Sequence, residues 1–465
     1  MKRICTKILL PALIASLLFT GCAARQTEEP ETEAAAKATT QTTTQAITGE
    51  ADSTESYFDL DDEAEDTTEA AAQKSAANAV TGVAKTQNAD SGDFADAFSD
   101  RDLKGDYDSA NAVVIRLSGT GADVSADTVR VSGSDVIITD AGTYLLSGTL
   151  EDGSVIVDAD KEDKVQLVLN GVTIHDESYA AICVKQADKV FITLAKGTEN
   201  SLSNGGSFTQ TDDNNVNAVI FAKDDITLNG TGSLTITSSA GHGIVGKDEV
   251  TITGGTYAIT AAKCAIRAND SIAIADGAFT LAAGTDGLHA ENDDDDTLGN
   301  IYIAGGTFTI RASDDAVHAN TLLQIDGGSL EITAAEGLEA TYIRLNDGTV
   351  TISASDDGVN AARKSSAYTP TVEINGGSLT ITMGAGDTDG VDANGNLIIN
   401  GGTVNITGRS AFDCDGTAQY NGGVLIINGQ QVDSIPVQQI GGGFGGGRGN
   451  GGFGGQGFSG GIRHG

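Results

Sequence analysis

A sequence unit of 20 to 29 residues recurs along the second half of the chain, and this repeat constrains the fold more than any other feature. Two successive copies read IYIAGGTFTIRASDDAVHANTL (301–322) and LQIDGGSLEITAAEGLEATY (323–342). Each copy contains a short apolar strand, a Gly-Gly pair, an alternating strand, an acidic corner and a third short strand. The copies begin at Val250, Ile272, Ile301, Leu323, Ile343, Val372 and Leu397. A repeat of this length is typical of a solenoid, whose stacked units bury an apolar face that a single unit leaves exposed.

Apolar residues alternate within each unit, and residues two apart on a strand share a face. The alternation therefore predicts three columns of inward-facing side chains. The first is Tyr257, Phe279, Phe308, Leu330, Val350, Leu379 and Val404; the second is Ile252, Ile274, Ile303, Ile325, Leu345, Ile374 and Ile399; the third is Leu288, Val317, Leu338, Val359, Val391 and Phe412. We expect an all-β fold, a right-handed parallel β-helix with three short strands per coil.

Glycine pairs such as Gly305-Gly306 mark one corner of the expected coil, because Gly adopts positive φ without strain. A sandwich of hairpins is the competing fold, but it would show turn signals about every 8–12 residues and no register between acidic corners. The Ca²⁺-binding nonapeptide solenoid fits less well, since here the Gly pair and the acid lie on opposite sides of a strand.

Composition divides the chain into four expected regions. Residues 1–21 join a basic head to the apolar run ILLPALIASLLF, which is typical of a secretory signal. The segment LFTGC (18–22) resembles a lipobox and predicts a lipid on Cys22, hence an extracellular protein anchored to the bacterial cell membrane only by that lipid; an ordinary signal peptide is the alternative. Residues 22–104 are rich in Thr, Ala and Glu and predict a disordered stalk. Residues 105–440 form the expected β-helix, and 441–465 a Gly-rich flexible tail.

Charge narrows the possible partners. The chain carries a formal net charge of −38 and no basic patch, which excludes nucleic acid as a partner. Three cysteines follow Cys22, namely Cys183, Cys264 and Cys414. Each lies beside inward-pointing residues, so we expect small buried apolar fillers.

Acidic residues recur in register at the corner that precedes the third strand. One column contains Asp286, Asp315, Glu336, Asp357 and Asp389, with Asp314 and Asp356 beside it; a second, three residues later, contains His289, His318, Glu339, Asn360, Asp392 and Asp413. Carboxylates on coils about 4.8 Å apart repel by about 3–4 kcal/mol at an effective dielectric near 20. Bound Ca²⁺, which prefers hard oxygen ligands, would relieve this repulsion. We therefore expect calcium ligands among Asp286, Asp314, Asp315, Glu336, Asp356, Asp357, Asp389 and Asp392; a solvated acidic edge is the alternative.

Three stretches resemble a known family. They are IFAKDDITLNGTGSLTITSSAGHGIVGKDEVTITGG (220–255), TDGLHAENDDDDTLGNIYIAGG (285–306) and SDDGVNA (355–361). They resemble the clostridial carbohydrate-binding β-helix lipoprotein family. The resemblance implies a pectate-lyase-like fold, bound Ca²⁺, and binding of acidic plant polysaccharide (polygalacturonate) and also cellulose. It adds Asp224, Asp225, Asp248 and Asp270 as metal-ligand candidates, although RAND (267–270) departs from the family pattern.

Three functions stay open at this point. A non-catalytic binding module would use Ca²⁺ to bridge protein and uronate carboxylates, with Lys247, Arg267, His289 and His318 contacting the polymer. The absence of Trp argues against a flat stacking platform for crystalline cellulose. A lyase would need Ca²⁺ and a basic residue of lowered pKa, for which Lys247 and Lys263 are the candidates. A structural adhesin would use Ca²⁺ for rigidity alone. We expect the binding module, because no committed base is evident.

Overall fold

The computed structural model describes residues 94, 96–386 and 388–436. The expected signal segment 1–21, Cys22, nearly all of the stalk and the tail 441–465 lie outside these residues. The described residues are all-β: 36 strands with mostly parallel pairing. No helix in this part of the chain is long and apolar enough to cross a membrane.

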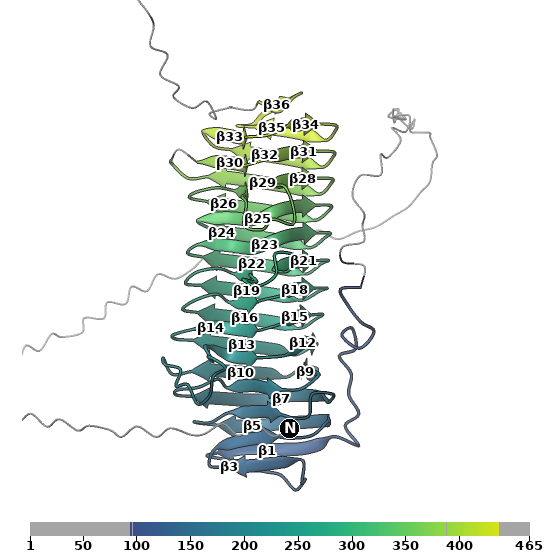
Figure 1. Ribbon diagram of the computed structural model, residues 1–465, viewed down its shortest axis with the longest axis vertical. Coiled ribbons are helices and arrows are strands. Elements are labelled where there is room, and N and C mark those ends of the chain that lie inside the picture. The colour runs from purple at the N-terminus through teal and green to yellow at the C-terminus, as the bar shows by residue number, and fades with distance from the viewer. Residues whose placement is uncertain (1–93, 95, 387, 437–465) are drawn as a thin grey trace, which may run out of the picture. The chain divides into compact units, whose positions relative to one another are not determined.

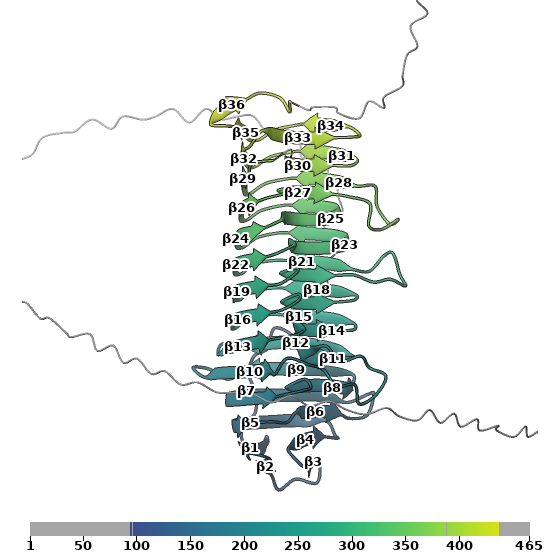
Figure 2. The same cartoon turned by 90° about the vertical axis from the view of Figure 1, so that its left-hand side faces the viewer.

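Parallel pairing between every third strand organises this part of the molecule. β14 (His242–Gly246) pairs with β17 (Ile266–Ala268), and β17 pairs with β20 (Leu288–Ala290). The chain therefore passes through three strands and returns to pair with the first, which is consistent with the expected β-helix. Figures 1 and 2 show the strands stacked one above another from β1 to β36.

The stacked strands form three walls. We call the first the ladder wall; it contains β4 (Asp135–Ile138), β6 (Val155–Asp158), β8 (Ile182–Gln186), β11 (Ala218–Ala222), β14, β17, β20, the start of β23 (Asp315–Ile325), the start of β25 (Glu336–Leu345), β27 (Val359–Ala361), β30 (Asp389–Ala393) and β33 (Ser410–Cys414). We call the second the strap wall, after the N-terminal segment described below that packs along it. It contains β9 (Lys189–Leu194), β12 (Asp225–Gly230), β15 (Glu249–Ile252), β18 (Ser271–Ile274), β21 (Asn300–Ile303), the ends of β23 and β25, β28 (Thr371–Ile374), β31 (Asn396–Ile399) and β34 (Ala418–Tyr420).

The third wall, the threonine wall, presents mostly Thr and Ser outward. It contains β10 (Glu199–Asn204), β13 (Ser233–Ser238), β16 (Thr256–Ala261), β19 (Ala278–Ala283), β22 (Thr307–Ala312), β24 (Ser329–Ala334), β26 (Thr349–Ala354), β29 (Ser378–Met383), β32 (Thr403–Thr407) and β35 (Val424–Ile427). β1 (Val113–Gly119), β5 (Gly142–Leu150) and β7 (Lys164–Asp176) run on from the strap wall into this wall. Antiparallel partners close the ends: β2 (Ala122–Asp123) and β3 (Val129–Ser132) at one end, and β36 (Gln430–Val432) at the other.

The core lies between the walls, and the predicted inward columns are confirmed. Every member of the three columns is at most 3% exposed. The rings of Tyr257, Phe279 and Phe308 stack on successive coils, with centroids 5.1 and 4.5 Å apart. At the glycine corner, Gly306 and Gly328 have φ of 102° and 89°, as a turn that only Gly enters easily requires.

Residues 94 and 96–106, which we call the strap, differ from the expectation. The expected disordered stalk ran to residue 104, but the strap packs along the strap wall, as Figure 1 shows beside the strands from β21 toward β7. Phe94 stacks on Tyr302 with ring centroids 4.6 Å apart, and the Arg101 guanidinium lies 4.7 Å from the centre of the Phe191 ring. Polar composition predicted disorder, whereas a few aromatic and charged contacts suffice to hold the segment.

Asp102 fixes the middle of the strap. Its Oδ1 accepts a hydrogen bond of 2.6 Å from the Thr227 hydroxyl and lies 2.9 Å from Lys189 Nζ. Its carbonyl accepts a bond of 2.6 Å from the Thr253 hydroxyl. Asp102 is only 2% exposed, so these contacts satisfy a buried carboxylate.

Candidate functional site

One outward-facing column runs the length of the ladder wall, with one residue from each strand. In register, it is Ile137, Ile156, Cys183, Phe221, Val245, Arg267, His289, His318, Glu339, Asn360, Asp392 and Asp413. The apolar first part packs against Tyr179, Phe208 and Val216 in a cluster separate from the main core. The remaining seven residues, from Arg267 to Asp413, are the polar ladder.

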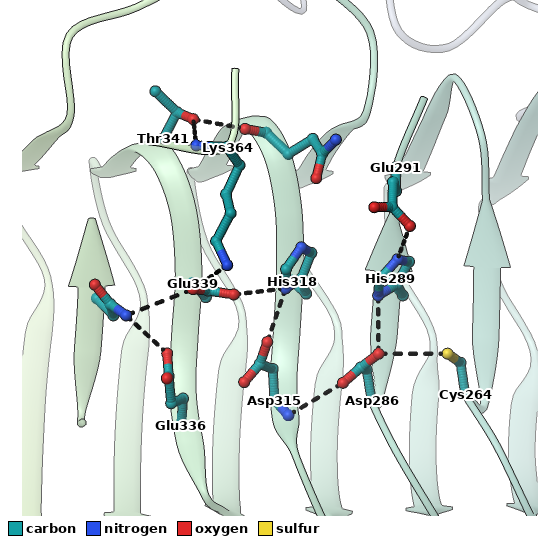
Figure 3. Close-up of polar contacts among 12 residues, drawn as sticks. Cys264, Asp286, His289, Glu291, Asp315, His318, Glu336, Glu339, Thr341 and Lys364 are labelled. Carbon is teal, nitrogen blue, oxygen red and sulfur yellow. Dashed lines mark hydrogen bonds and ion pairs between the residues drawn. The ribbon is translucent and has the colours of Figure 1, made fainter. Parts of the chain in front are cut away.

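The predicted register of the acidic residues is confirmed where strands pair. Asp315 faces Glu336, and His318 faces Glu339, on neighbouring coils. Among the described residues, two groups of three possible metal ligands have their ligand atoms within 4.8 Å of one another: Cys264, Asp286 and His289; and Asp315, His318 and Glu339. Figure 3 shows both groups side by side on the ladder wall.

The first group combines sulfur, nitrogen and oxygen. Asp286 Oδ2 lies 2.8 Å from His289 Nδ1 and 3.4 Å from Cys264 Sγ. Burial raises the pKa of Asp286, but the hydrogen bond and charge of His289 outweigh burial and leave that pKa lowered. His289 Nε2 lies 3.1 Å from Glu291 Oε2, and Arg267 Nη2 lies 3.1 Å from the same oxygen.

The second group is an ion-pair network. His318 Nδ1 lies 2.7 Å from both Asp315 Oδ2 and Glu339 Oε2, and Lys364 Nζ lies 2.7 Å from Glu339 Oε1. Burial opposes charge on His318, but the two carboxylates raise its pKa to about 10. Burial also opposes charge on Glu339, but His318 and Lys364 lower its pKa to about 2. Burial and the charge of Glu339 raise the pKa of Asp315 to about 6 despite its bond to His318.

The end of the ladder beyond Glu339 offers only oxygen ligands. Asn360 Nδ2 donates to Glu336 Oε2 at 3.0 Å, while Asn360 Oδ1 is buried without a hydrogen-bond partner. Burial and neighbouring acids raise the pKa of Glu336 to about 7, and burial and Asp357 raise the pKa of Asp392 to about 6. An unpartnered amide oxygen among crowded carboxylates fits a hard cation, because Ca²⁺ binds carboxylate and amide oxygens. We call Asp357, Asn360, Asp389, Asp392 and Asp413 the oxygen end.

The acids suggested by family resemblance occupy a different corner. Asp224, Asp248 and Asp270 lie in turns between the ladder and strap walls, and Asp225 begins β12 directly after one of these turns. Burial and the charges of the other three raise the pKa of Asp248 to about 6, so the four carboxylates lie close enough to repel one another. None of the four belongs to a three-ligand group within the described residues. Asp314 and Asp356 are exposed and likewise lie outside both groups. A metal role for these six stays a prediction.

The two lysines considered as bases differ in environment. Lys247 is half-buried, and burial together with the charge of Arg267 lowers its pKa. Lys263 is exposed.

Sequence reasoning missed the position of Cys264. We expected only a small buried apolar filler there. Cys264 is buried, at 3% exposure, but it occupies the coil position directly before Asp286 and lies within reach of His289. Following the acidic column back by one repeat reaches this cysteine, and that signal was present in the sequence. Glu291 and Lys364 were also not expected to contact the ladder histidines or Glu339.

A separate pocket of about 980 Å³ lies where the strap crosses the glycine corner. Leu103, Tyr107, Lys196, Gly230 and Asp276 are among its lining residues. None of the predicted site residues lines it.

The stacked parallel strands and the in-register ladder define a class of β-sheet protein that presents a linear array of charged and polar side chains. A family model described as carbohydrate-binding domain-containing protein matches residues 132–387 and 335–434, and the chain belongs to this family. The expected carbohydrate-binding family is thereby confirmed, while its lipoprotein character, its β-helix specifics and its binding of polygalacturonate stay predictions.

Two relatives accompany the family match. A carbohydrate-binding domain-containing protein of Acetivibrio thermocellus is 40% identical over 139 residues, which are 30% of this chain and 49% of the relative. The chain thus spans about half the length of this curated relative. A solved structure described as a polysaccharide lyase-like protein from C. thermocellum, in a gadolinium derivative, is 34% identical with a TM-score of 0.48. That similarity covers 52% of this chain and 96% of the solved one.

Proposed function

We propose that this protein is a non-catalytic surface module that binds acidic polysaccharide, such as polygalacturonate, through Ca²⁺ held on a right-handed parallel β-helix. Cellulose is a further candidate ligand. In this proposal Cys22 carries the lipid that attaches the chain to the outside of the bacterial membrane. Membership of the carbohydrate-binding family supports the ligand class.

The observation that carries the proposal is the unpartnered Asn360 Oδ1. This buried acceptor lies on the ladder between Glu339 and Asp392. A buried polar atom without a partner costs about 1–3 kcal/mol. A cation at this point would satisfy Asn360 Oδ1 and would offset the burial and the carboxylate repulsion that together raise the pKa of Asp392 and Asp357.

The same cation would explain how an acidic protein holds an acidic polymer. With a net charge of −38, the chain repels uronate carboxylates unless a bound ion inverts the local field. Two basic groups at the ladder are already paired, Arg267 with Glu291 and Lys364 with Glu339. Ca²⁺ takes about six to eight oxygen ligands, whereas two protein carboxylates in monodentate contact supply two, so uronate oxygens and water could complete its shell.

Retention of the purified protein on insoluble polygalacturonate tests the proposal. We expect retention with Ca²⁺, none with chelator, and at least a tenfold loss in the double variant Asp357→Asn with Asp392→Asn. Asp347→Asn is the matched control, because Asp347 is exposed and its Oδ1 bonds only to the adjacent Gly348 amide at 2.7 Å. Ca²⁺-independent retention, or equal retention of the double variant, would contradict the proposal.

A lyase is the second candidate, and the lowered pKa of Lys247 favours it specifically. A lysine that loses its proton more readily is a better base at neutral pH. Unsaturated products released during the same retention assay, and lost in Lys247→Ala but not in Lys263→Ala, would establish catalysis. Metal-dependent stability without retention or product would instead indicate the structural adhesin.

A further inference from the structure

Cys264, Asp286 and His289 bring three different ligand types to one point of the ladder wall. Cys264 precedes β17, Asp286 precedes β20, and His289 lies within β20, so all three are positioned by stacked strands. The side chains of Asp286 and His289 are only 9% and 11% exposed, and Cys264 is 3% exposed. Calcium does not favour this set, because it prefers oxygen. Thiolate, imidazole and carboxylate together suit Zn²⁺ and related transition-metal ions.

The groups around these three residues are arranged as the surroundings of a metal site usually are. His289 offers Nδ1 to the cluster, while its Nε2 lies 3.1 Å from the Glu291 carboxylate. Metal-ligating histidines commonly donate their second ring nitrogen to a carboxylate in this way. Asp286 Oδ1 accepts the Asp315 amide at 3.2 Å, which leaves Oδ2 toward Cys264 and His289.

The cysteine is held in place from both sides. Its backbone amide donates to His242 Nδ1 at 3.2 Å, and its Sγ lies 3.2 Å from the Thr285 hydroxyl. Figure 3 shows the thiol pointing toward Asp286. The sulfur is thus directed at the ligand cluster, and the apolar core does not enclose it.

The neighbouring group of Asp315, His318 and Glu339 makes a useful contrast. It has no sulfur, and the Lys364 ammonium already lies 2.7 Å from Glu339. Two carboxylates there share two cationic side chains, so their charge is balanced without a metal. A second positive ion at that point would meet the charge of Lys364.

We propose that Cys264, Asp286 and His289 bind a transition-metal ion of the Zn²⁺ class, separately from any Ca²⁺ at the oxygen end. Glu291 orients His289 and is a positioning residue. Three protein ligands leave one position of a tetrahedral ion open to water or to an incoming oxygen ligand. The inference is independent of the proposed polysaccharide binding.

Titration of the full chain with Co²⁺ under reducing conditions tests this site, because a cobalt–thiolate bond has its own charge-transfer absorption. We expect one such band for the wild type, its removal by stoichiometric Zn²⁺, and its persistence in excess Ca²⁺. Cys264→Ser removes the band. His289→Asn keeps the thiol and weakens Co²⁺ binding at least tenfold, and Glu291→Gln weakens binding by about 10- to 100-fold.

Matched controls separate this site from its neighbours. His318→Asn changes the equivalent histidine one coil away, and Cys414→Ser removes another buried thiol; both should keep the band. Absence of the band in the wild type, its persistence in Cys264→Ser, or its loss in His318→Asn would overturn the assignment. If Cys264→Ser does not fold, unchanged Co²⁺ affinity in His289→Asn overturns it equally.

Discussion

Replacing Asp102 by Asn should detach the strap without unfolding the stacked coils. Asp102 accepts bonds from the Ser99 hydroxyl and the Thr227 hydroxyl, each at 2.6 Å, and pairs with Lys189 at 2.9 Å. Lys189 is 16% exposed at its side chain, so it would lose its ion-pair partner Asp102 while remaining largely buried. A hydrogen bond to a charged group is worth about 1.5–3 kcal/mol. We therefore expect the free energy of strap opening to fall by about 2–3 kcal/mol.

Limited trypsinolysis measures this opening directly, because the strap contains Arg101 and Lys104. When opening is fast relative to cleavage, the cleavage rate follows the equilibrium population of the open strap. A loss of 2–3 kcal/mol then raises cleavage by about 30- to 150-fold. Asp100→Asn is the matched control, since Asp100 is exposed on the same segment. Equal cleavage of the two variants would refute the anchoring role of Asp102.

The pH dependence of strap opening tests whether the Asp102 carboxylate holds the strap in its charged form. Burial raises the pKa of Asp102, but bonds from Ser99, Thr227 and Lys189 outweigh burial and leave that pKa lowered. An unperturbed aspartate has a pKa of about 3.9. The strap contact is therefore complete above about pH 4 and weakens as the pH falls toward the lower pKa of the closed state. Asp102→Asn should lack this acid-dependent opening, as an acid-stable probe protease such as pepsin would report.

Three further perturbations test the fold and the proposed calcium site. Phe308→Ala removes the centre of an aromatic stack and should cost about 3–5 kcal/mol in urea unfolding, whereas the outward-facing Thr309→Ala should change stability by less than about 0.5 kcal/mol. Gly105→Ala should open the strap to trypsin, because a Cβ there would lie 2.7 Å from the Gly230 backbone; slow cleavage in this variant would contradict the close crossing. Chelation of Ca²⁺ should lower the thermal midpoint of the wild type but not that of the double variant Asp357→Asn with Asp392→Asn. At a Ca²⁺ concentration a hundredfold above the Kd, removal of the ion should lower the free energy of unfolding of the wild type by about 2.7 kcal/mol.

The repeat made the core predictable. Apolar and polar residues alternate strictly around Phe308 and Ile310, so only one face of the strand can be buried. Shifting the strand register by one residue would expose every apolar side chain of that column. Stacking then fixes which residues meet on neighbouring coils, and this is why the pairing of His318 with Glu339 followed from the spacing alone.

The strap and the ligand cluster were harder to predict, for different reasons. Contacts such as Phe94 with Tyr302 join positions far apart in sequence and leave no periodic pattern. Cys264 lay in a predictable column, but its chemistry depends on side-chain directions that the register does not specify. The orphaned oxygen of Asn360 likewise depends on which way its amide turns toward Glu336.

Long-wavelength anomalous diffraction from crystals of the protein grown with Ca²⁺ tests the central claim most directly. The account predicts a calcium peak at the oxygen end of the ladder, within about 2.3–2.6 Å of Asn360 Oδ1 and of oxygens from Asp357 or Asp392. A fully ordered oxygen end without a calcium peak there, or calcium bound only at other acids, would contradict it.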